Sequence, residues 1–402
     1  MHIAMVTDYY LPSLGGVQTA VKAAKESLES LGHEVTIFCP RFEPSTDDSV
    51  VALPASPIFK PDGYPFTWPY AHTYELMKAE FMRRQIDVVH VHSEMFAALA
   101  GLQAARDLSI PSVQTMHGRV DVYSASVLPL PSVSTALLAR MHGARIPHTL
   151  APSTDTRYNR GRVARRMWRL MINQANFADH VVVPSAHFAQ KLVDQGVSRP
   201  VSIISNGLED SALRRVGNSQ PRVLSPDEPL RIMWCGRVSP EKRPDIFLTA
   251  LSQMTSNFVA NLYGEGVAFA PTKRLVHRLG LDDRVTMHGP VPQEDVLAAM
   301  QTHHVFVSSS YDFDNQPMVL LEAMASLLPA VVSDPDLLEM FPDGTATAAF
   351  GPDAAGLAAA LDSLCADPIQ VEQMSKALLN ASEAVSQNTH VRALLDVYEG
   401  LL

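Results

Sequence analysis

Two basic residues closely follow one predicted strand in the second half of the chain. Arg237 and Lys242 stand just past the apolar run Arg231–Cys235. A diphosphate placed there would receive the planar fork of a guanidinium and the point charge of an ammonium. The alternative is a solvated basic loop in which these cations pair with Glu241. The pattern alone therefore favours neither interpretation.

Two carboxylates eight residues apart follow another predicted strand, Val305–Ser308. Asp314 precedes a helix whose Pro317 suits the first turn, and Glu322 lies about two turns further along. Such a helix would offer both carboxylates to hydroxyl groups, with the backbone amides of residues 315–319 between them. A core helix with two incidental acidic residues is the alternative.

Paired glycines, Gly15 and Gly16, separate the predicted strand His2–Thr7 from the predicted helix Val17–Leu31. Glycines at such a turn let backbone amides approach a phosphate or a sugar at a helix N-terminus. The spacing is not the G-x-G-x-x-G of dinucleotide-binding folds, and an ordinary turn is the simpler interpretation.

A scaffold that positions these residues must bring strand ends together. Short apolar runs alternate with amphipathic helical segments, which predicts parallel sheets covered by helices on both faces. The rhythm breaks over Asn206–Pro229, where three prolines fall, and then resumes. We expect an α/β fold of two doubly wound, Rossmann-like domains at 1–210 and 229–385, joined by a linker at 211–228. Ligands in such sheets bind outside the carboxyl ends of the strands, so the expected site is a central cleft that both domains face.

The predicted strands are the most apolar of these short runs. Those of the first sheet are His2–Thr7, Glu34–Cys39, Asp87–Val91, Ser112–Thr115, His180–Val183 and Val201–Ile204, and those of the second are Arg231–Cys235, Phe258–Leu262, Arg284–His288, Val305–Ser308 and Ala330–Val332.

Composition excludes several classes of protein. With 402 residues, 47% of them apolar and 18% charged, the chain is expected to fold throughout. A formal net charge of -10 argues against nucleic acid as a partner. Three isolated cysteines cannot form a disulfide framework, which indicates a reducing compartment. The N-terminus lacks the basic region of a signal peptide, and no apolar run reaches the ~18 residues of a membrane span. We therefore expect a cytoplasmic protein whose membrane contact, if any, is peripheral, on the inner face of the plasma membrane.

Taken together, the motifs resemble the retaining GT-B glycosyltransferases of family 4. The similarity covers nearly the whole chain and is densest at 231–335. The matching segments are Gly15-Gly16, Thr115-Met116-His117-Gly118, Pro184-Ser185, Asn206-Gly207, Gly236-Arg237 with Glu241-Lys242, Gly264-Glu265-Gly266, His288-Gly289 and the acid–x7–Glu322-Ala-Met segment. In the family the first acid of that last segment is usually Glu and precedes a glycine-bearing turn. Here it is Asp314, followed by Asn315-Gln316-Pro317, which leaves the donor sugar open.

The resemblance assigns a role to each matching position. Arg237 and Lys242 would hold the donor pyrophosphate and stabilise the departing nucleoside diphosphate, and Glu322 would accept hydrogen bonds from the ribose. His117 would face the transferred sugar. The other donor-site residues that it implies are Asp314, Asn315, Gln316, Pro317, Met318 and Val319 for the sugar, Gly289 and Val291 for the base, and Gly15 and Gly16 for close approach of a phosphate or the acceptor.

The expected reaction is transfer of a hexose from a nucleotide sugar, of the GDP-mannose or UDP-glucose type, to a hydroxyl acceptor. A membrane glycolipid or lipid-linked precursor is the leading acceptor. The resemblance also implies that 1–210 is the acceptor side, that 229–385 binds the nucleotide sugar, and that a helix at 386–402 crosses back to the first domain. The alternatives are an epimerase or hydrolase of sugar nucleotides, a transferase acting on a small soluble phosphorylated or sugar acceptor, and a two-lobed binding protein without activity.

No cofactor and no metal are expected. Fixed cations and helix N-termini aimed at the departing anion stabilise the transition state without one. Asp312-Phe313-Asp314 and Asp334-Pro335-Asp336 match the metal-binding DxD pattern of another glycosyltransferase fold, but such tripeptides arise readily by chance. His90 and His92 share a strand face without a third ligand nearby, so core or cleft histidines are expected there.

Six arginines crowd into residues 157–169 with no acidic residue between the first and the last. On a helix, four of them share one face and an apolar set forms another. The basic face is Arg162, Arg165, Arg166 and Arg169, and the apolar face is Val163, Met167, Leu170 and Met171, with Trp168 at the flank. Such a helix would bind an anionic lipid surface. The alternatives are a core helix that shows its arginines to water and a pocket for a phosphate-bearing acceptor. The neighbouring segment 120–150 is expected to be irregular, as a loop or lid.

Overall fold

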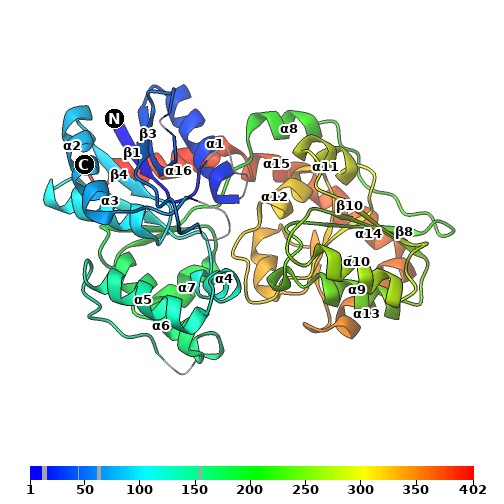
Figure 1. Cartoon of the computed structure of the whole chain (residues 1–402). Helices are drawn as coiled ribbons and strands as arrows, with labels where there is room; N and C mark the ends of the chain where they lie inside the picture. The colour runs from blue at the N-terminus through cyan, green and yellow to red at the C-terminus, as the bar shows by residue number, and fades with distance from the viewer. Residues whose placement is uncertain (11–15, 44, 61–64, 154–155) are drawn as a thin grey trace. The chain divides into compact units, whose positions relative to one another are not determined.

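The computed structural model describes residues 1–402 apart from 11–15, 44, 61–64 and 154–155. The chain forms two compact units (Figure 1). Unit 1 comprises Met1–Asn206 with His390–Leu402, and unit 2 comprises Gly207–Thr389. Each unit is built on one wholly parallel sheet with helices on both faces, which confirms the predicted α/β class.

Unit 1 contains a seven-stranded sheet in the order β3-β2-β1-β4-β5-β6-β7. Its strands are β1 (His2–Val6), β2 (Glu34–Pro40), β3 (Val50–Leu53), β4 (Val88–Val91), β5 (Ser112–Thr115), β6 (His180–Val183) and β7 (Val201–Ile203). Its helices are α1 (Gly16–Ser30), α2 (Tyr70–Arg84), α3 (Phe96–Asp107), α4 (Val120–Val127), α5 (Pro131–Gly143), α6 (Arg162–Ala175), α7 (Ala186–Asp194) and most of α16 (Gln387–Glu399), with a 3-10 turn, η2, at Arg157–Asn159.

Alternation along β1 divides the core of unit 1 between the two faces of the sheet. Ile3 and Met5 pack with α1 and with Tyr398 of α16 on one face. Ala4 and Val6 pack with α2 and α3 on the other face. Because successive side chains of a strand point to opposite faces, a continuous apolar run is what a strand covered on both sides needs.

Unit 2 contains a six-stranded sheet in the order β10-β9-β8-β11-β12-β13. Its strands are β8 (Leu230–Cys235), β9 (Phe258–Tyr263), β10 (Val285–Gly289), β11 (Val305–Ser308), β12 (Ala330–Val332) and β13 (Ala346–Ala348). Its helices are α8 (Asp210–Val216), α9 (Pro244–Gln253), α10 (Phe269–Arg278), α11 (Gln293–Met300), α12 (Met318–Ala325), α13 (Ala354–Ala366), α14 (Pro368–Ala377) and α15 (Ala381–Ala384), with 3-10 turns η3 (Pro240–Lys242), η4 (Pro335–Met340) and η5 (Leu378–Asn380). Ile232 and Trp234 face α9 and α13, whereas Met233 faces α12.

Two features of the fold differ from the expectation. The segment 120–150 is not irregular, because it forms α4 and α5. Pro131 occupies the first turn of α5, and the Thr135 hydroxyl donates to the Pro131 carbonyl at 2.6 Å, so residues that look like loop formers are accommodated in a helix. Residues 211–228, expected as a linker, lie within unit 2 and include most of α8.

Among the helices of the described residues, none is both long and apolar enough to cross a membrane. The three cysteines are unpaired, with Cys39 buried and the other two half-buried.

Candidate active site

Backbone hydrogen bonds join three loops at the carboxyl ends of β8, β9 and β10. The Gly236 amide donates to the Tyr263 carbonyl at 3.1 Å, and the Gly264 amide donates to the Gly289 carbonyl at 2.8 Å. Gly264 has a φ of +122°, and a Cβ there would lie 2.0 Å from the Gly236 carbonyl oxygen. Only glycine allows this close approach, which fixes the loop that carries Arg237.

Lys242 and Asp314 meet at the carboxyl ends of the neighbouring strands β8 and β11. The Lys242 ammonium lies 2.6 and 2.8 Å from the two carboxylate oxygens of Asp314, and both side chains are largely buried. A buried polar chain supports the pair, since the Trp234 indole donates to the Ser309 hydroxyl at 2.9 Å. That hydroxyl donates in turn to the Lys242 carbonyl at 2.7 Å. The structure thus brings two of the predicted catalytic residues together.

Arg237 pairs with Glu241, which is the alternative interpretation that the sequence left open. Its guanidinium donates to Glu241 at 2.8 Å, and its side chain is 41% exposed. Glu241 also accepts from the Ser239 hydroxyl at 2.7 Å. A partly exposed ion pair of this kind contributes little to stability, so Arg237 can exchange its partner at small cost.

Glu322 lies on α12 as a buried carboxyl group. The Gln293 side-chain amide, at the start of α11, donates to one of its oxygens at 2.5 Å. Burial raises the pKa of Glu322 to about 7, and the hydrogen bond from Gln293 opposes that rise. Gln293 was not predicted, because its partner lies 29 residues away and no local pattern marks the pair.

The other predicted donor residues lie at the same edge of this sheet. Asn315 is buried in the turn that leads to α12, while Pro317 caps the helix in an extended conformation, so α12 begins one residue later than predicted. Met318 and Val319 form the first helical turn, and Gln316 is half-buried beside them. Gly289 ends β10 with a φ of +73°, and Val291 packs against the core of unit 2.

The second DxD tripeptide has a structural use. One Asp334 carboxylate oxygen accepts from the Asp336 amide at 3.1 Å, which caps η4. The other oxygen accepts from the Asp312 amide at 2.7 Å. Among the described residues, no group of three or more histidine, cysteine or acidic side chains is placed to hold a metal ion.

Histidines lie in β4 and just after β4 and β5, near the carboxyl edge of the unit 1 sheet. His117 Nε2 lies 3.2 Å from His92 Nδ1, and burial lowers the pKa of His117 to about 4, so its ring is neutral near pH 7. His90 contacts the Tyr398 hydroxyl of α16 at 2.5 Å and the Thr115 hydroxyl at 2.6 Å. Gly16 is the first residue of α1, whereas Gly15 lies outside the described residues.

Two carboxyl groups at this edge were missed by sequence reasoning. Asp8 accepts from the Ser93 hydroxyl at 2.6 Å and from the Ala97 amide at 3.0 Å, so it caps α3. Glu94 is buried, and its Oε1 has no hydrogen-bond partner within the described part of the chain. Burial, assisted by Asp8, raises the pKa of Glu94 to about 8. A single carboxylate after a strand gives no sequence signal that separates these roles.

The arginine-rich helix forms as predicted, as α6, with one correction. Trp168 is not at its flank but fully buried, with its ring 5.0 Å from the Tyr158 ring. The reason is that its ring packs against the rings of Tyr158 and Phe188 within the core of unit 1.

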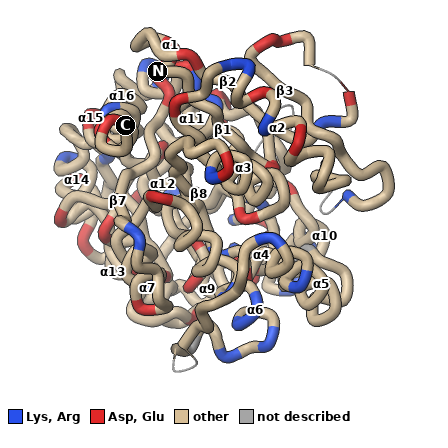
Figure 2. The backbone as a smooth tube through the Cα atoms, turned by 90° about the vertical axis from the view of Figure 1, so that its left-hand side faces the viewer, with Lys and Arg blue, Asp and Glu red and all other residues tan. Residues whose placement is uncertain are grey.

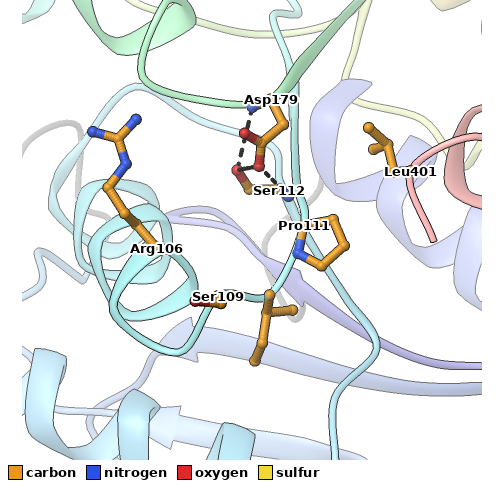
Figure 3. A pocket seen from close by; sticks show the side chains of 7 residues that line it. Arg106, Ser109, Pro111, Ser112, Asp179 and Leu401 are labelled. Carbon is orange, nitrogen blue, oxygen red and sulfur yellow. Dashed lines mark hydrogen bonds between the residues drawn. The ribbon is translucent and has the colours of Figure 1, made fainter.

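A pocket of about 340 Å³ in unit 1 lies at the opposite edge of the sheet (Figure 3). Its lining includes Arg106, Ser112 and Asp179, and the Ser112 hydroxyl donates to Asp179 at 2.9 Å. Ser112 begins β5 and Asp179 precedes β6, so the pocket faces the amino ends of the strands. Ligands of doubly wound sheets bind at the carboxyl ends, and this pocket is therefore not the candidate site.

The chain matches two family models, and solved structures share its fold. Residues 14–212 match the family model Glycosyltransferase Family 4, and residues 217–380 match Glycosyl transferases group 1. Among solved structures, sucrose-phosphate synthase of Thermosynechococcus elongatus superposes with a TM-score of 0.72 at 19% identity, covering 100% of this chain and 98% of that one. Anabaena HepE in complex with UDP superposes with a TM-score of 0.69 at 16% identity, covering all of both chains. The protein therefore has the GT-B fold.

Curated relatives are similar over most of their length. The α-monoglucosyldiacylglycerol synthase of Acholeplasma laidlawii is 24% identical over 85% of this chain and 82% of its own. The GDP-mannose-dependent α-mannosyltransferase of Mycobacterium tuberculosis is 24% identical, over 83% and 79% respectively. The D-inositol 3-phosphate glycosyltransferase of Xylanimonas cellulosilytica is 26% identical, over 96% and 91%. The chain belongs to the GT-B glycosyltransferases of the family 4 type, and it is a hexosyltransferase.

Proposed function

We propose that the enzyme moves a hexose, with retention of configuration, from a UDP- or GDP-linked donor to a hydroxyl of a lipid acceptor. The observation that carries the donor half is the Lys242–Asp314 contact, with Arg237 on the adjoining loop and Glu322 on α12, all at the carboxyl edge of the unit 2 sheet. These are the groups that a diphosphate, a hexose and a ribose each require.

The cations act on the leaving group. Breaking the sugar–phosphate bond leaves positive charge on the anomeric carbon and negative charge on the departing diphosphate. Two N–H groups of Lys242 donate to Asp314, and the third donates to a phosphate oxygen when the donor binds. Arg237 turns from Glu241 to the same diphosphate. Because this charge grows during bond cleavage, both residues stabilise the transition state more than the bound donor.

The carboxylates orient the rest of the donor. Asp314 and the amides of Asn315 and Val319 bind sugar hydroxyls, while Glu322 accepts from the ribose. Gly289 and Val291 flank the base. We place the acceptor hydroxyl on the same face of the sugar as the departing phosphate. Its oxygen bonds to the anomeric carbon, the phosphate oxygen leaves with the bonding pair, and that phosphate takes the hydroxyl proton.

No divalent metal or other cofactor enters this scheme, because Arg237 and Lys242 supply the positive charge. A lipid acceptor is supported by the names of relatives such as the glucosyldiacylglycerol synthase, and it would place the enzyme in the cytoplasm, on the inner face of the plasma membrane. Support for retention is the likeness to the retaining members of the family.

The test is a matrix of donors and acceptors with the full chain. UDP-glucose and GDP-mannose are each incubated with vesicles of diacylglycerol or glucosyldiacylglycerol, with inositol phosphate, and with no acceptor. Hexosylated lipid whose anomeric configuration by NMR matches that of the donor supports the proposal. Donor consumption without acceptor indicates the hydrolase or epimerase, and product on inositol phosphate alone indicates a soluble acceptor. Calorimetry that detects no affinity for UDP or GDP overturns the donor site itself.

A further inference from the structure

Positive charge is concentrated in one stretch of unit 1. Residues 122–178 contain eight arginines, no lysine and a single acidic residue, in a chain whose formal net charge is -10. Figure 2 shows Lys and Arg residues gathered around α5 and α6. Such a local excess marks a surface that meets an anionic partner, because solubility alone would not require it against the overall charge.

The arginines of α6 form a row that reaches onto α5. Arg162, Arg165 and Arg169 are exposed, whereas Met167 and Met171 on the opposite side are buried. The Arg166 guanidinium donates to the Ser132 carbonyl in the first turn of α5. Arg169 donates to the His148 carbonyl at 2.8 Å. The first bond holds the Arg166 guanidinium beside α5, and the second holds that of Arg169 beside the segment that follows α5.

An apolar stripe runs along α5 itself. Val133 and Leu137 are 65% and 58% exposed, and their spacing of four residues places them on one side of the helix. Leu130, which precedes the first turn as the N-cap, is 75% exposed. Thr135 and Leu138 point inward and are buried. Large aliphatic side chains that line up at such exposures mark an interaction surface.

We propose that Leu130, Val133 and Leu137 together with Arg162, Arg165, Arg166 and Arg169, here called the α5–α6 face, dock the enzyme on an anionic lipid bilayer. The aliphatic side chains enter the boundary between headgroups and acyl chains, and the guanidinium groups bind lipid phosphates. A nucleic acid or an acidic protein surface would match the arginines, but it would leave the apolar stripe in water. That this docking presents a lipid acceptor rests on the proposed function, whereas the binding itself does not.

The experiment measures co-sedimentation of the full chain with two kinds of vesicle, phosphatidylcholine with phosphatidylglycerol and phosphatidylcholine alone. We expect binding to the first and little to the second. Raising the salt from ~0.1 M to ~1 M shortens the screening length from about 10 Å to about 3 Å and should weaken the binding. Equal binding to both vesicles, or no binding to either, overturns the proposal.

Two double variants separate the charged and apolar contributions. Arg162→Glu with Arg165→Glu removes two cations, each worth roughly fivefold in affinity near an anionic surface, so a loss of at least about 25-fold is expected. Val133→Gln with Leu137→Gln should weaken binding even at low salt. The matched control is Arg274→Glu with Arg278→Glu, which makes the same charge change at exposed positions of α10 and should bind like the parent.

Each remaining outcome decides the matter. If the glutamine pair binds like the parent while the glutamate pair does not, the partner is a polyanion without an apolar interior, and the lipid proposal fails. If the glutamate pair and the α10 control lose binding equally, overall charge and not this face is responsible. Calorimetric affinity for UDP or GDP is measured on every variant, so that a failed docking surface is distinguished from a failed donor site.

Discussion

The Lys242 ammonium lies within 2.8 Å of both carboxylate oxygens of Asp314, across 72 residues of sequence. The contact joins the ends of two neighbouring strands, β8 and β11. A cation held by a carboxylate beside a diphosphate site is prevented from turning toward solvent, so it costs little reorganisation when the donor arrives.

Lys242→Ala should lower turnover by roughly 10²–10³-fold, because the departing diphosphate loses a fixed cation. The measurement is initial rate under saturating donor, with circular dichroism to establish that the fold is retained. Lys273→Ala, at an exposed position of α10, is the matched control and should leave the rate unchanged. Near-normal turnover in Lys242→Ala would remove the lysine from the donor site.

Glu322 should make nucleotide affinity depend on pH near neutrality. Its pKa lies at about 7 before ligand binds, and only the ionised form accepts fully from ribose hydroxyls. Affinity for UDP or GDP should therefore rise between about pH 6 and pH 8, by up to roughly tenfold, as binding favours the deprotonated carboxylate. Calorimetry at several pH values measures it.

Two variants isolate this dependence from the titration of the nucleotide phosphate. Glu322→Gln should keep only the phosphate contribution. Gln293→Leu removes the hydrogen bond that opposes the raised pKa of Glu322, so the midpoint should move to higher pH. Parallel profiles in the parent and Glu322→Gln would contradict the ribose assignment.

Glu94 should make the folded protein less stable at high pH. Its pKa is about 8 in the folded protein against 4.5 for an ordinary glutamate. The contribution of Glu94 to the free energy of unfolding is fully present below pH 4.5. It is lost as the pH rises through 8, because the folded state must then hold a buried charge. The melting temperature of Glu94→Gln should exceed that of the parent by an amount that grows between about pH 5 and pH 9. Glu75→Gln, on the exposed side of α2, is the control, and a pH-independent difference for Glu94→Gln would contradict the idea.

Gly264→Ala should destabilise unit 2 far more than Gly280→Ala. Both glycines have a positive φ, but a Cβ at 264 meets the Gly236 carbonyl oxygen at 2.0 Å, and one at 280 meets nothing within 4 Å. The second variant therefore reports backbone strain alone, about 1 kcal/mol, while the first adds displacement of the Arg237 loop. Thermal melts and UDP affinity measure the two effects. Equal losses in both variants would show that the loop tolerates the shift.

Activity should survive prolonged treatment with EDTA, because Arg237 and Lys242 take the charge that a divalent ion would otherwise neutralise. Rates before and after chelation measure this, and a magnesium add-back is the control. A loss of turnover that magnesium restores would return Asp312 and Asp314 to consideration as metal ligands.

The sequence predicted the central strands well because each is a short apolar run. Ser112–Thr115, His180–Val183 and Val305–Ser308 have the predicted bounds. The edge strands β3 and β13 were missed. Each has only three or four residues and pairs with a neighbouring strand on one side only, so its sequence shows no clear apolar run. Composition misled over α5, where two serines and one proline are held within a regular helix.

Short motifs singled out candidate residues such as Lys242, Asp314 and Glu322, whose roles stay predictions, and the structure places all three at the carboxyl edge of one sheet. The site was not predicted where two distant side chains meet. No local sequence pattern marks Gln293. Its hydrogen bond to Glu322 is apparent only in the structure, where α11 places the two side chains together. Asp8 and Glu94 are both single acids after strands, and burial raises the pKa of both. Only the packing around them makes Asp8 an acceptor from Ser93 and Ala97 and leaves Glu94 Oε1 without a partner in the described part of the chain.

Tyr398 has a practical consequence for anyone who dissects this enzyme. It belongs to the last helix, yet it fills the interior of the first unit beside Ile3 and bonds to His90. A fragment that stops at Asn206 would therefore lack part of its own interior and should aggregate. The stretch Gly207–Thr389 is uninterrupted in sequence and is the better fragment to express alone.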